Sequence, residues 1–158
     1  MKKFFAMLIF ATIFLTGCGE SAEKIFVTEN EKIVAEKNII PQEEIKIKIQ
    51  IGDKIFNATM EDHPAARKFV KNLPLEVTMT ELNGNEKYFR FDKTFPSSDK
   101  KIGTIHNGDL MLWSSNTVVL FYKDFSTSYS YTRLGKIENP ADLEKILGAG
   151  NVSVKFYK

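Results

Sequence analysis

The stretch "IKIKIQIGDKIFNATM", residues 45–60, decides the fold class of this chain. In its first half isoleucine alternates with lysine or glutamine, which is the pattern of a strand with one buried and one exposed face. Residues 52–54, Gly-Asp-Lys, form a turn sequence, and residues 55–60 return along the first strand as a hairpin. The stretch therefore predicts antiparallel β structure.

Further strands and two short helices follow. Residues 75–82 and 86–91 flank an Asn-Gly-Asn turn, whose first two residues tolerate the positive φ of a tight hairpin. Pro64 and Pro74 bound a first helix, and residues 139–148 carry the cap and stop residues of a second. The predicted order is two strands, a helix, five strands, a helix and a closing strand. Many short strands with two helices favour a mainly β barrel capped at its ends.

The N-terminal stretch "MKKFFAMLIFATIFLTGC" has a charged start and an apolar run from Phe4 to Leu15. That run has the length of a signal-peptide core and is too short to span a bilayer unaided. It ends in Leu-Thr-Gly-Cys, which resembles the lipobox of bacterial lipoproteins, where the cysteine is lipidated and becomes the mature N-terminus. Cys18 is the only cysteine in the chain. An ordinary signal peptide whose last residue is cysteine is the alternative.

The lipobox resemblance implies that the chain has three segments, and it implies a location in the cell. Residues 1–17 are expected to be a lipoprotein signal peptide, and residues 18–44 the lipidated Cys18 with a flexible acidic tether. Residues 45–158 then form the globular domain. The protein is expected in the cell envelope, attached through its lipid to the outer side of the cytoplasmic membrane or to the outer membrane.

The charge of the chain argues against a nucleic-acid partner. The formal net charge of +2 comes from Lys2 and Lys3, since the chain otherwise carries as many basic as acidic side chains. Both lysines belong to the predicted signal peptide. The remaining chain lacks the basic field that nucleic acids require.

Four segments are similar to a bacterial group described as cyclophilin-like: "NGNEKYF" (83–89), "GDLMLW" (108–113), "VVLFYKDFSTSYSYTRLGKIENPADL" (118–143) and "NVSVKF" (151–156). The resemblance covers essentially all of residues 45–158. It implies a closed eight-stranded cyclophilin-like barrel with two short helices, in the order read above. The function of this group is unassigned, and fold alone does not transfer activity.

Cyclophilins are peptidyl-prolyl isomerases that use an arginine on a Phe-His-Arg strand, a Gln-Gly-Gly-Asp segment and an aromatic groove. Here "FRF" (89–91) and "NGD" (107–109) stand at comparable places, without the histidine and the glutamine. Arg90 is therefore the one candidate catalytic residue that the resemblance offers. The incomplete set favours a non-catalytic domain that binds a peptide or small ligand; a prolyl isomerase assisting exported proteins is the alternative.

The stretch "DFSTSYSYTRLGKI" (124–137) has two interpretations. On an alternating strand over about residues 127–134, its two tyrosines and its arginine share one face. This face is either part of an exposed strand or the border of a ligand groove, since aromatic rings with polar tips and arginine suit recognition. The candidate binding residues are Tyr88, Arg90, Trp113, Tyr122, Tyr129, Tyr131 and Arg133. Glu86 also has two interpretations: its carboxylate accepts hydrogen bonds from the turn amides, or it is the acidic residue of the ligand groove.

Several kinds of site are not expected. His63 and His106 lie far apart in the sequence, and no thiol follows Cys18, so neither a soft metal site nor a cysteine nucleophile is predicted. Neither a G-x-S-x-G elbow nor a glycine-rich phosphate loop is present. No cofactor or metal is expected.

Overall fold

The computed structural model describes residues 43–158. The predicted signal peptide, Cys18 and nearly all of the predicted tether lie outside these residues. The described part contains nine strands and two helices. They are, in order, β1 (Ile45–Ile51), β2 (Lys54–Met60), α2 (Pro64–Val70), β3 (Leu75–Leu82), β4 (Glu86–Arg90), β5 (Lys100–Ile105), β6 (Asp109–Trp113), β7 (Thr117–Phe121), β8 (Phe125–Ile137), α3 (Leu143–Leu147) and β9 (Val152–Tyr157).

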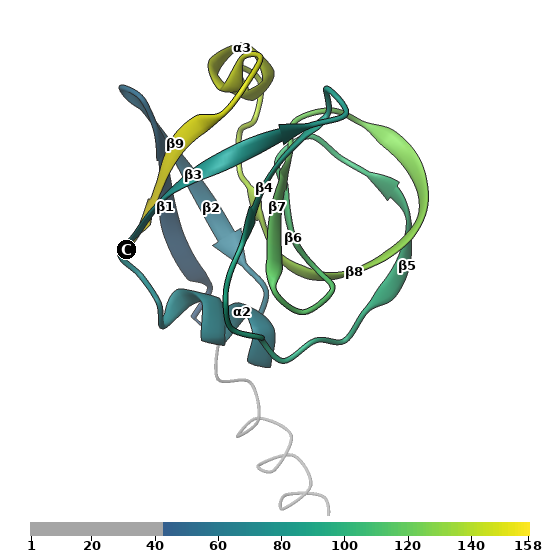
Figure 1. The fold of residues 1–158 in the computed structure, drawn as a ribbon. Helices are drawn as coiled ribbons and strands as arrows, with labels where there is room; N and C mark the ends of the chain where they lie inside the picture. Colours follow the sequence, from purple (N-terminus) through teal and green to yellow (C-terminus); the bar gives the residue numbers. More distant parts are fainter. Residues whose placement is uncertain (1–42) are drawn as a thin grey trace, which may run out of the picture. The chain divides into compact units, whose positions relative to one another are not determined.

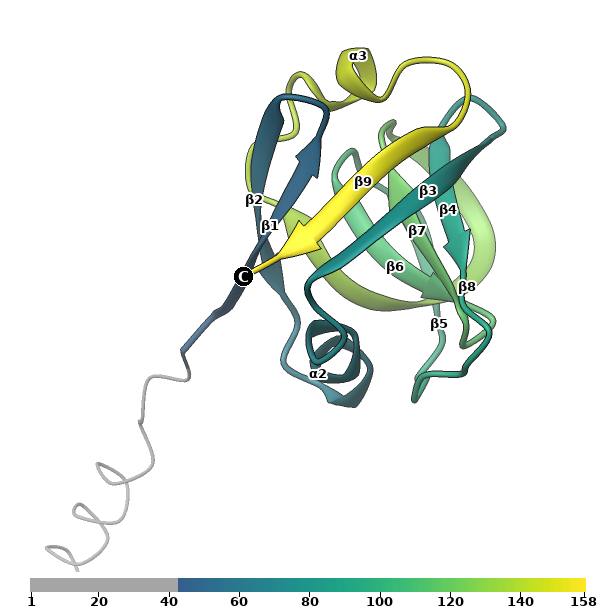
Figure 2. The same ribbon diagram turned by 60° about the vertical axis from the view of Figure 1, so that its left-hand side comes forward.

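Eight of the strands close into an antiparallel barrel (Figure 1). The order around it is β2-β1-β9-β3-β4-β7-β6-β8, and the barrel closes where Ala58, Thr59 and Met60 of β2 pair with β8. The stretch with which the sequence argument began forms the predicted hairpin, with all seven residues of β1 paired to β2. Figure 2 shows β1, β9 and β3 side by side on the face turned to the viewer. The predicted fold class is confirmed.

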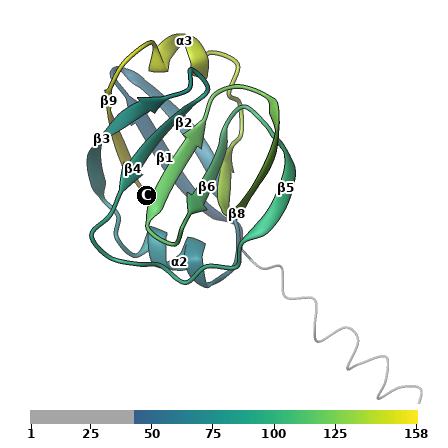
Figure 3. The same cartoon turned by 45° about the vertical axis from the view of Figure 1, so that its right-hand side comes forward.

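The predicted count of five strands between the helices was one too few, because six lie there. The strand outside the barrel is β5, which pairs only with the first half of β8, from Ile105 opposite Phe125 to Lys100 opposite Tyr131. β8 has 13 residues, and its second half pairs with β6 and β2 inside the barrel. We call β5 together with residues 125–131 of β8 the arm. Figure 3 shows the face that carries it, with β5 at the right-hand edge beside β8.

The barrel interior is one apolar core closed at both ends by helices. Inward side chains such as Ile49, Leu112 and Phe156 are fully or almost fully buried. At one end Phe69 of α2 packs edge-on against Phe156, with 5.4 Å between ring centroids. At the other end α3 buries Leu143 and Leu147 (Figure 1). The two helices are therefore end caps, as predicted.

The second helix starts later than predicted. α3 begins at Leu143, and its N-cap residue is Asp142 instead of Asn139. Residues 139–142 instead form an irregular approach, in which the Pro140 carbonyl accepts hydrogen bonds from Leu143 and from the Asn107 side chain. Pro140 therefore lies in a turn before the helix and not at its first position. Of the predicted helix ends, only the C-terminal one, at Gly148, is confirmed.

A second, smaller apolar core lies on the outer face of the barrel beneath the arm. Its buried members are Ile105, Met111, Val119, Phe121 and Tyr131. Met111, Val119 and Phe121 belong to β6 and β7, and Ile105 and Tyr131 belong to the arm. The arm is thus held against the barrel by its own packing, and the space beside this packing becomes the candidate site.

Candidate ligand-binding groove

The arm and the outer face of the barrel enclose a groove of about 590 Å³. We call it the arm groove. Its lining comes from the β3–β4 hairpin (Leu82, Asn83, Asn85), β4 (Glu86, Tyr88, Arg90), β6 and β7 (Trp113, Thr117, Val119) and the arm (Phe125, Ser126, Thr127, Ser128, Tyr129, Tyr131). Alternate residues of β4 point into it because successive side chains of a strand face opposite sides.

Exposed apolar surface is concentrated at the arm groove. Among residues 43–158, four large apolar side chains are exposed, and three of them line the groove: Leu82 (41% exposed), Trp113 (47%) and Tyr129 (65%). Ile55 of β2, at 56%, is the fourth and does not line it. Clustered exposed apolar side chains commonly mark a binding surface, whereas a single one such as Ile55 needs no explanation.

The groove has a charged group at each end of β4. Glu86 pairs with Phe121 and Arg90 with Thr117, so the two side chains stand four residues apart on one strand face. At about 3.3 Å per residue their α-carbons are separated by roughly 13 Å. Arg90 is exposed, whereas Glu86 is only 9% exposed. The groove is therefore polar at both ends and aromatic between them.

Glu86 does not serve the turn, which was one of its two predicted roles. The Gly84 amide of that turn donates instead to Oε1 of Glu81, at 2.9 Å. Burial raises the pKa of Glu86 to about 7, and the nearby charge of Glu81 acts in the same direction. Glu86 lines the groove, so its position fits the other predicted role, that of an acidic residue of the ligand groove.

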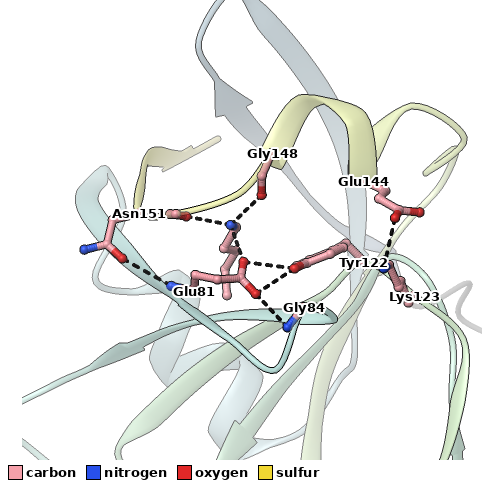
Figure 4. A network of polar contacts seen from close by, with 9 residues as sticks. Glu81, Gly84, Tyr122, Lys123, Glu144, Gly148 and Asn151 are labelled. Atoms are coloured by element: carbon pink, nitrogen blue, oxygen red, sulfur yellow. Dashed lines mark hydrogen bonds and ion pairs between the residues drawn. The ribbon is translucent and has the colours of Figure 1, made fainter.

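Behind β4, on the side away from the groove, lies a buried polar network centred on Lys87. The ammonium group of this fully buried lysine donates to Glu81 and to the carbonyl oxygens of Gly148 and Gly150, at 2.8 and 2.6 Å. The Tyr122 hydroxyl donates to Glu81 as well, at 2.8 Å (Figure 4). Burial and the bond to Glu81 raise the pKa of Tyr122 well above its usual value. This network ties the β3–β4 hairpin to the segment between α3 and β9.

The structure brings together five of the seven candidate binding residues: Tyr88, Arg90, Trp113, Tyr129 and Tyr131 all line the arm groove. Tyr122 lies in the Lys87 network instead. Arg133 lies beyond the arm, where β8 has joined the barrel opposite Met111, and its Nη1 is 3.5 Å from the buried Asp109. Arg133 shares the outer face with Tyr131, since it pairs with Met111 of the second core, but it lies past the end of the groove.

The Asn-Gly-Asp segment does not line the groove with Arg90. It begins β6, whereas Trp113, which shares the groove with Arg90, ends β6. The Asp109 carboxylate accepts the His106 amide at 2.9 Å, and the Asn107 amide donates to Asp124 at 2.7 Å. These bonds give the segment a structural task in the turn before β6.

The sequence argument missed Leu82 and Phe125 as groove residues. Leu82 ends β3 directly beside the Asn-Gly turn, and an apolar residue at an exposed hairpin end was the available signal. Phe125 was assigned to no element, because the predicted strand began at residue 127. Its place in the lining depends on the longer course of β8.

Residues 43–158 contain neither a candidate metal cluster nor a candidate membrane-spanning helix. Between residues 43 and 158, His, Cys, Asp and Glu side chains do not gather in any group of three or more that could hold a metal ion. In the same part of the chain, no helix has the length and apolar character needed to cross a membrane.

Comparison with known proteins agrees with the barrel. The solution structure of a hypothetical protein from Archaeoglobus fulgidus superimposes with a TM-score of 0.50 at 20% identity, covering 72% of this chain and 94% of that one. At this identity the likeness concerns the fold alone. No curated protein matches the sequence. Residues 49–157 match the model of the Cyclophilin-like family, and the chain belongs to that family.

Proposed function

We propose that the protein is a lipid-anchored, extracytoplasmic binding protein whose cyclophilin-like domain holds a peptide or small ligand in the arm groove, without catalysis. One observation carries the proposal: three of the four large exposed apolar side chains of residues 43–158 line a single groove. Leaving them in water costs about 25 cal/mol per Å² of apolar surface, which a ligand covering them would recover.

The size and stiffness of the groove suit this role. Its volume of about 590 Å³ lies within the range typical of small-ligand pockets, roughly 300–1,000 Å³. One wall is fixed in advance, because Tyr131 packs edge-on against Phe121 with ring centroids 5.5 Å apart. A preformed aromatic wall reduces the ordering cost of binding.

Tyr129→Ala is expected to weaken ligand binding about tenfold, because truncating an aromatic contact residue typically costs about 1–2 kcal/mol. The measurement is a titration of the purified full chain with aromatic small molecules and with peptides containing Phe or Tyr. Trp113 is the only tryptophan of the chain, so its emission reports directly on the groove. Stability should hardly change, since Tyr129 is 65% exposed.

Ile55→Ala is the matched control, because Ile55 is similarly exposed and lies outside the groove. It is expected to bind every ligand as the unmodified chain does. The proposal is wrong if no member of the panel changes the Trp113 emission, or if Tyr129→Ala and Ile55→Ala have equal effects.

Prolyl isomerisation is the second candidate, favoured by the position of Arg90 beside Trp113 in the groove. Against it stands the separate position of residues 107–109. Xaa-Pro peptides in the same panel distinguish the two functions, since uncatalysed exchange takes tens to hundreds of seconds and NMR detects even weak catalysis. We expect binding without faster exchange; faster exchange that Arg90→Ala abolishes would establish the isomerase instead.

The lipid anchor is the part of the proposal that rests on the sequence of residues 1–18. The full chain expressed in a bacterium is expected to incorporate labelled fatty acid and to sediment with membranes. Cys18→Ser is expected to abolish the label completely, because the thiol that carries the lipid is gone. A label that persists in Cys18→Ser, or the absence of label in the unmodified chain, contradicts the lipid anchor. Neither result bears on ligand binding in the arm groove.

A further inference from the structure

We propose that the arm groove selects a ligand bearing a protonated amine, which Glu86 binds at one end while the aromatic side chains hold the attached apolar group. This inference rests on the proposed function and deepens it by naming the ligand chemistry. Two acceptors without donors carry it: the Glu86 carboxylate in the lining and the enclosed side-chain oxygen of Asn85 beside it.

The first acceptor is the Glu86 carboxylate. The residue is only 9% exposed and lines the groove, and the Gly84 amide of the turn donates to Glu81 instead of Glu86. Within residues 43–158, burial and the charge of Glu81 perturb Glu86, and no hydrogen bond to it contributes. The Glu86 oxygens are not among the enclosed unpartnered atoms, so they are accessible in the groove. A carboxylate in such largely desolvated surroundings is strongly stabilised by a cationic partner.

The second acceptor is the side-chain oxygen of Asn85. This atom is buried and, within the part of the chain that the structure describes, has no hydrogen-bond partner. Asn85 lines the same groove and precedes Glu86 directly in the chain. Since less than 1 Å² of this oxygen is accessible, a ligand does not reach it, but its partial negative charge beside Glu86 makes this end of the groove favourable for a cation.

The protein's own cations do not meet this demand. The ammonium group of the neighbouring Lys87 donates its three hydrogen bonds to Glu81, Gly148 and Gly150, behind β4. Arg90 lies at the other end of the same strand face. Neither cation pairs with Glu86, so the carboxylate is free to accept from a ligand, and a primary ammonium group has three donors.

The wall beside this end suits a cation with an apolar group attached. Tyr88 and Tyr131 of the lining belong to the second core, and a cation near aromatic faces gains further attraction. Farther along the groove, Trp113 and Tyr129 offer exposed rings. Arg90 at the far end disfavours a second positive charge there, so the expected ligand carries one amine.

Binding is expected to strengthen from pH 6 to pH 8. The titratable groups whose charges act on Glu86 or feel its charge are Glu81, whose pKa is lowered, and Tyr122 and Tyr131, whose pKa values are raised, so none of these changes charge in this interval. The pKa of Glu86 itself is about 7, so its ionised fraction grows from about one tenth to about nine tenths. An aliphatic amine remains protonated throughout, and its affinity is expected to rise up to about tenfold.

Calorimetric titration of the purified full chain tests the inference with phenethylamine and its neutral counterpart phenethyl alcohol as probes. At pH 8 the amine is expected to bind about tenfold more tightly than the alcohol. At pH 6 the advantage is expected to fall to a small factor, and Glu86→Gln is expected to remove it at both pH values. Glu144→Gln, which changes an exposed carboxylate outside the groove, is the matched control and should keep it.

A free small amine and the amino terminus of a peptide present the same chemistry. The tripeptide Phe-Gly-Gly and its N-acetylated form distinguish them: a tenfold preference for the free amino terminus identifies a peptide ligand. Binding of phenethylamine without that preference identifies a small amine.

Equal binding of amine and alcohol at pH 8, or an amine preference that survives in Glu86→Gln, overturns the inference. Absence of binding by both probes overturns it as well. Failure of this inference can be distinguished from failure of the proposed function. The aromatic small molecules and peptides that are titrated by Trp113 emission test binding in the groove whether or not they carry an amine. Urea unfolding of Glu86→Gln checks that the variant is folded, and an isosteric neutral side chain is expected to leave its stability intact or improved.

Discussion

Lys87→Met is expected to lower the free energy of unfolding by about 3–5 kcal/mol, the usual cost of removing one partner from a buried ion pair. Lys87 is completely buried and makes three hydrogen bonds through its ammonium group. Methionine fills most of the same volume, so the loss comes from the polar groups left behind. These are the Glu81 carboxylate and the carbonyls of Gly148 and Gly150.

Urea unfolding at pH 7 measures this effect, and Lys46→Met is its control. Lys46 also pairs with carboxylates, Glu44 at 3.5 Å and Glu138 at 3.2 Å, but it is exposed, and exposed pairs contribute little. Equal stability of the two variants would mean that the Lys87 network does not hold the β3–β4 hairpin against the segment after α3.

The effect of Lys87→Met should also depend on pH. Burial acts to raise the pKa of Glu81, but hydrogen bonds from Lys87, Tyr122 and Gly84 outweigh it, and the pKa lies below its usual value. A carboxyl group whose pKa is lower in the folded chain adds stability above its unfolded pKa, which is lost as pH falls through the folded pKa. The difference between Lys87→Met and the unmodified chain is therefore expected to shrink below about pH 4.

Gly135→Ala is expected to lower the free energy of unfolding by about 3 kcal/mol, at the upper end of the usual cost of overpacking. A Cβ atom at this position would lie 2.5 Å from the Thr59 carbonyl oxygen and 2.9 Å from the Met60 Cα. Gly135 pairs with Met60 where β8 meets β2 and the barrel closes. The clash therefore forces apart the one pairing that makes the sheet a barrel.

Urea unfolding again gives the measurement, with Lys136→Ala as the control at the next, exposed position of β8. Shortening Met60 in the Gly135→Ala background is not expected to restore stability, because the nearest atom belongs to the Thr59 backbone and cannot move aside. Full restoration by Met60→Ala would show that side-chain crowding alone keeps position 135 a glycine.

Local patterns were sufficient for the barrel. The alternation in β1 and the Asn-Gly turn before β4 are properties of adjacent residues, so they are readable without knowing what packs against them. The arm was not readable in this way. β5 and β8 look like ordinary strands in sequence, and only their long-range partners determine that β5 lies outside the barrel.

The residues of the candidate site were likewise predictable where a strand is regular, and not where long-range partners decide their position. Tyr88 and Arg90 were placed on one face correctly because β4 is regular. Arg133 was grouped with Tyr131 by the same alternation, but β8 changes partners between them, from β5 to β6, with an irregular register farther along. Tyr122 continues the alternation of β7: with Val118 and Leu120 it belongs to the main core, on the side away from the groove. Its hydroxyl donates to Glu81, 41 residues away in sequence, a partner that no local pattern indicates.

Closing a sheet into a barrel removes its free edges, but β5 restores one, since it ends the order of strands with β8 as its sole neighbour. An open edge with unpaired amides and carbonyls invites a strand from another molecule, which is a route to aggregation. β5 carries two features that oppose this: exposed Lys100 and Lys101, and a kink in its register before Gly103. The strand that completes the arm thus also carries features that keep neighbouring molecules from adding to the sheet.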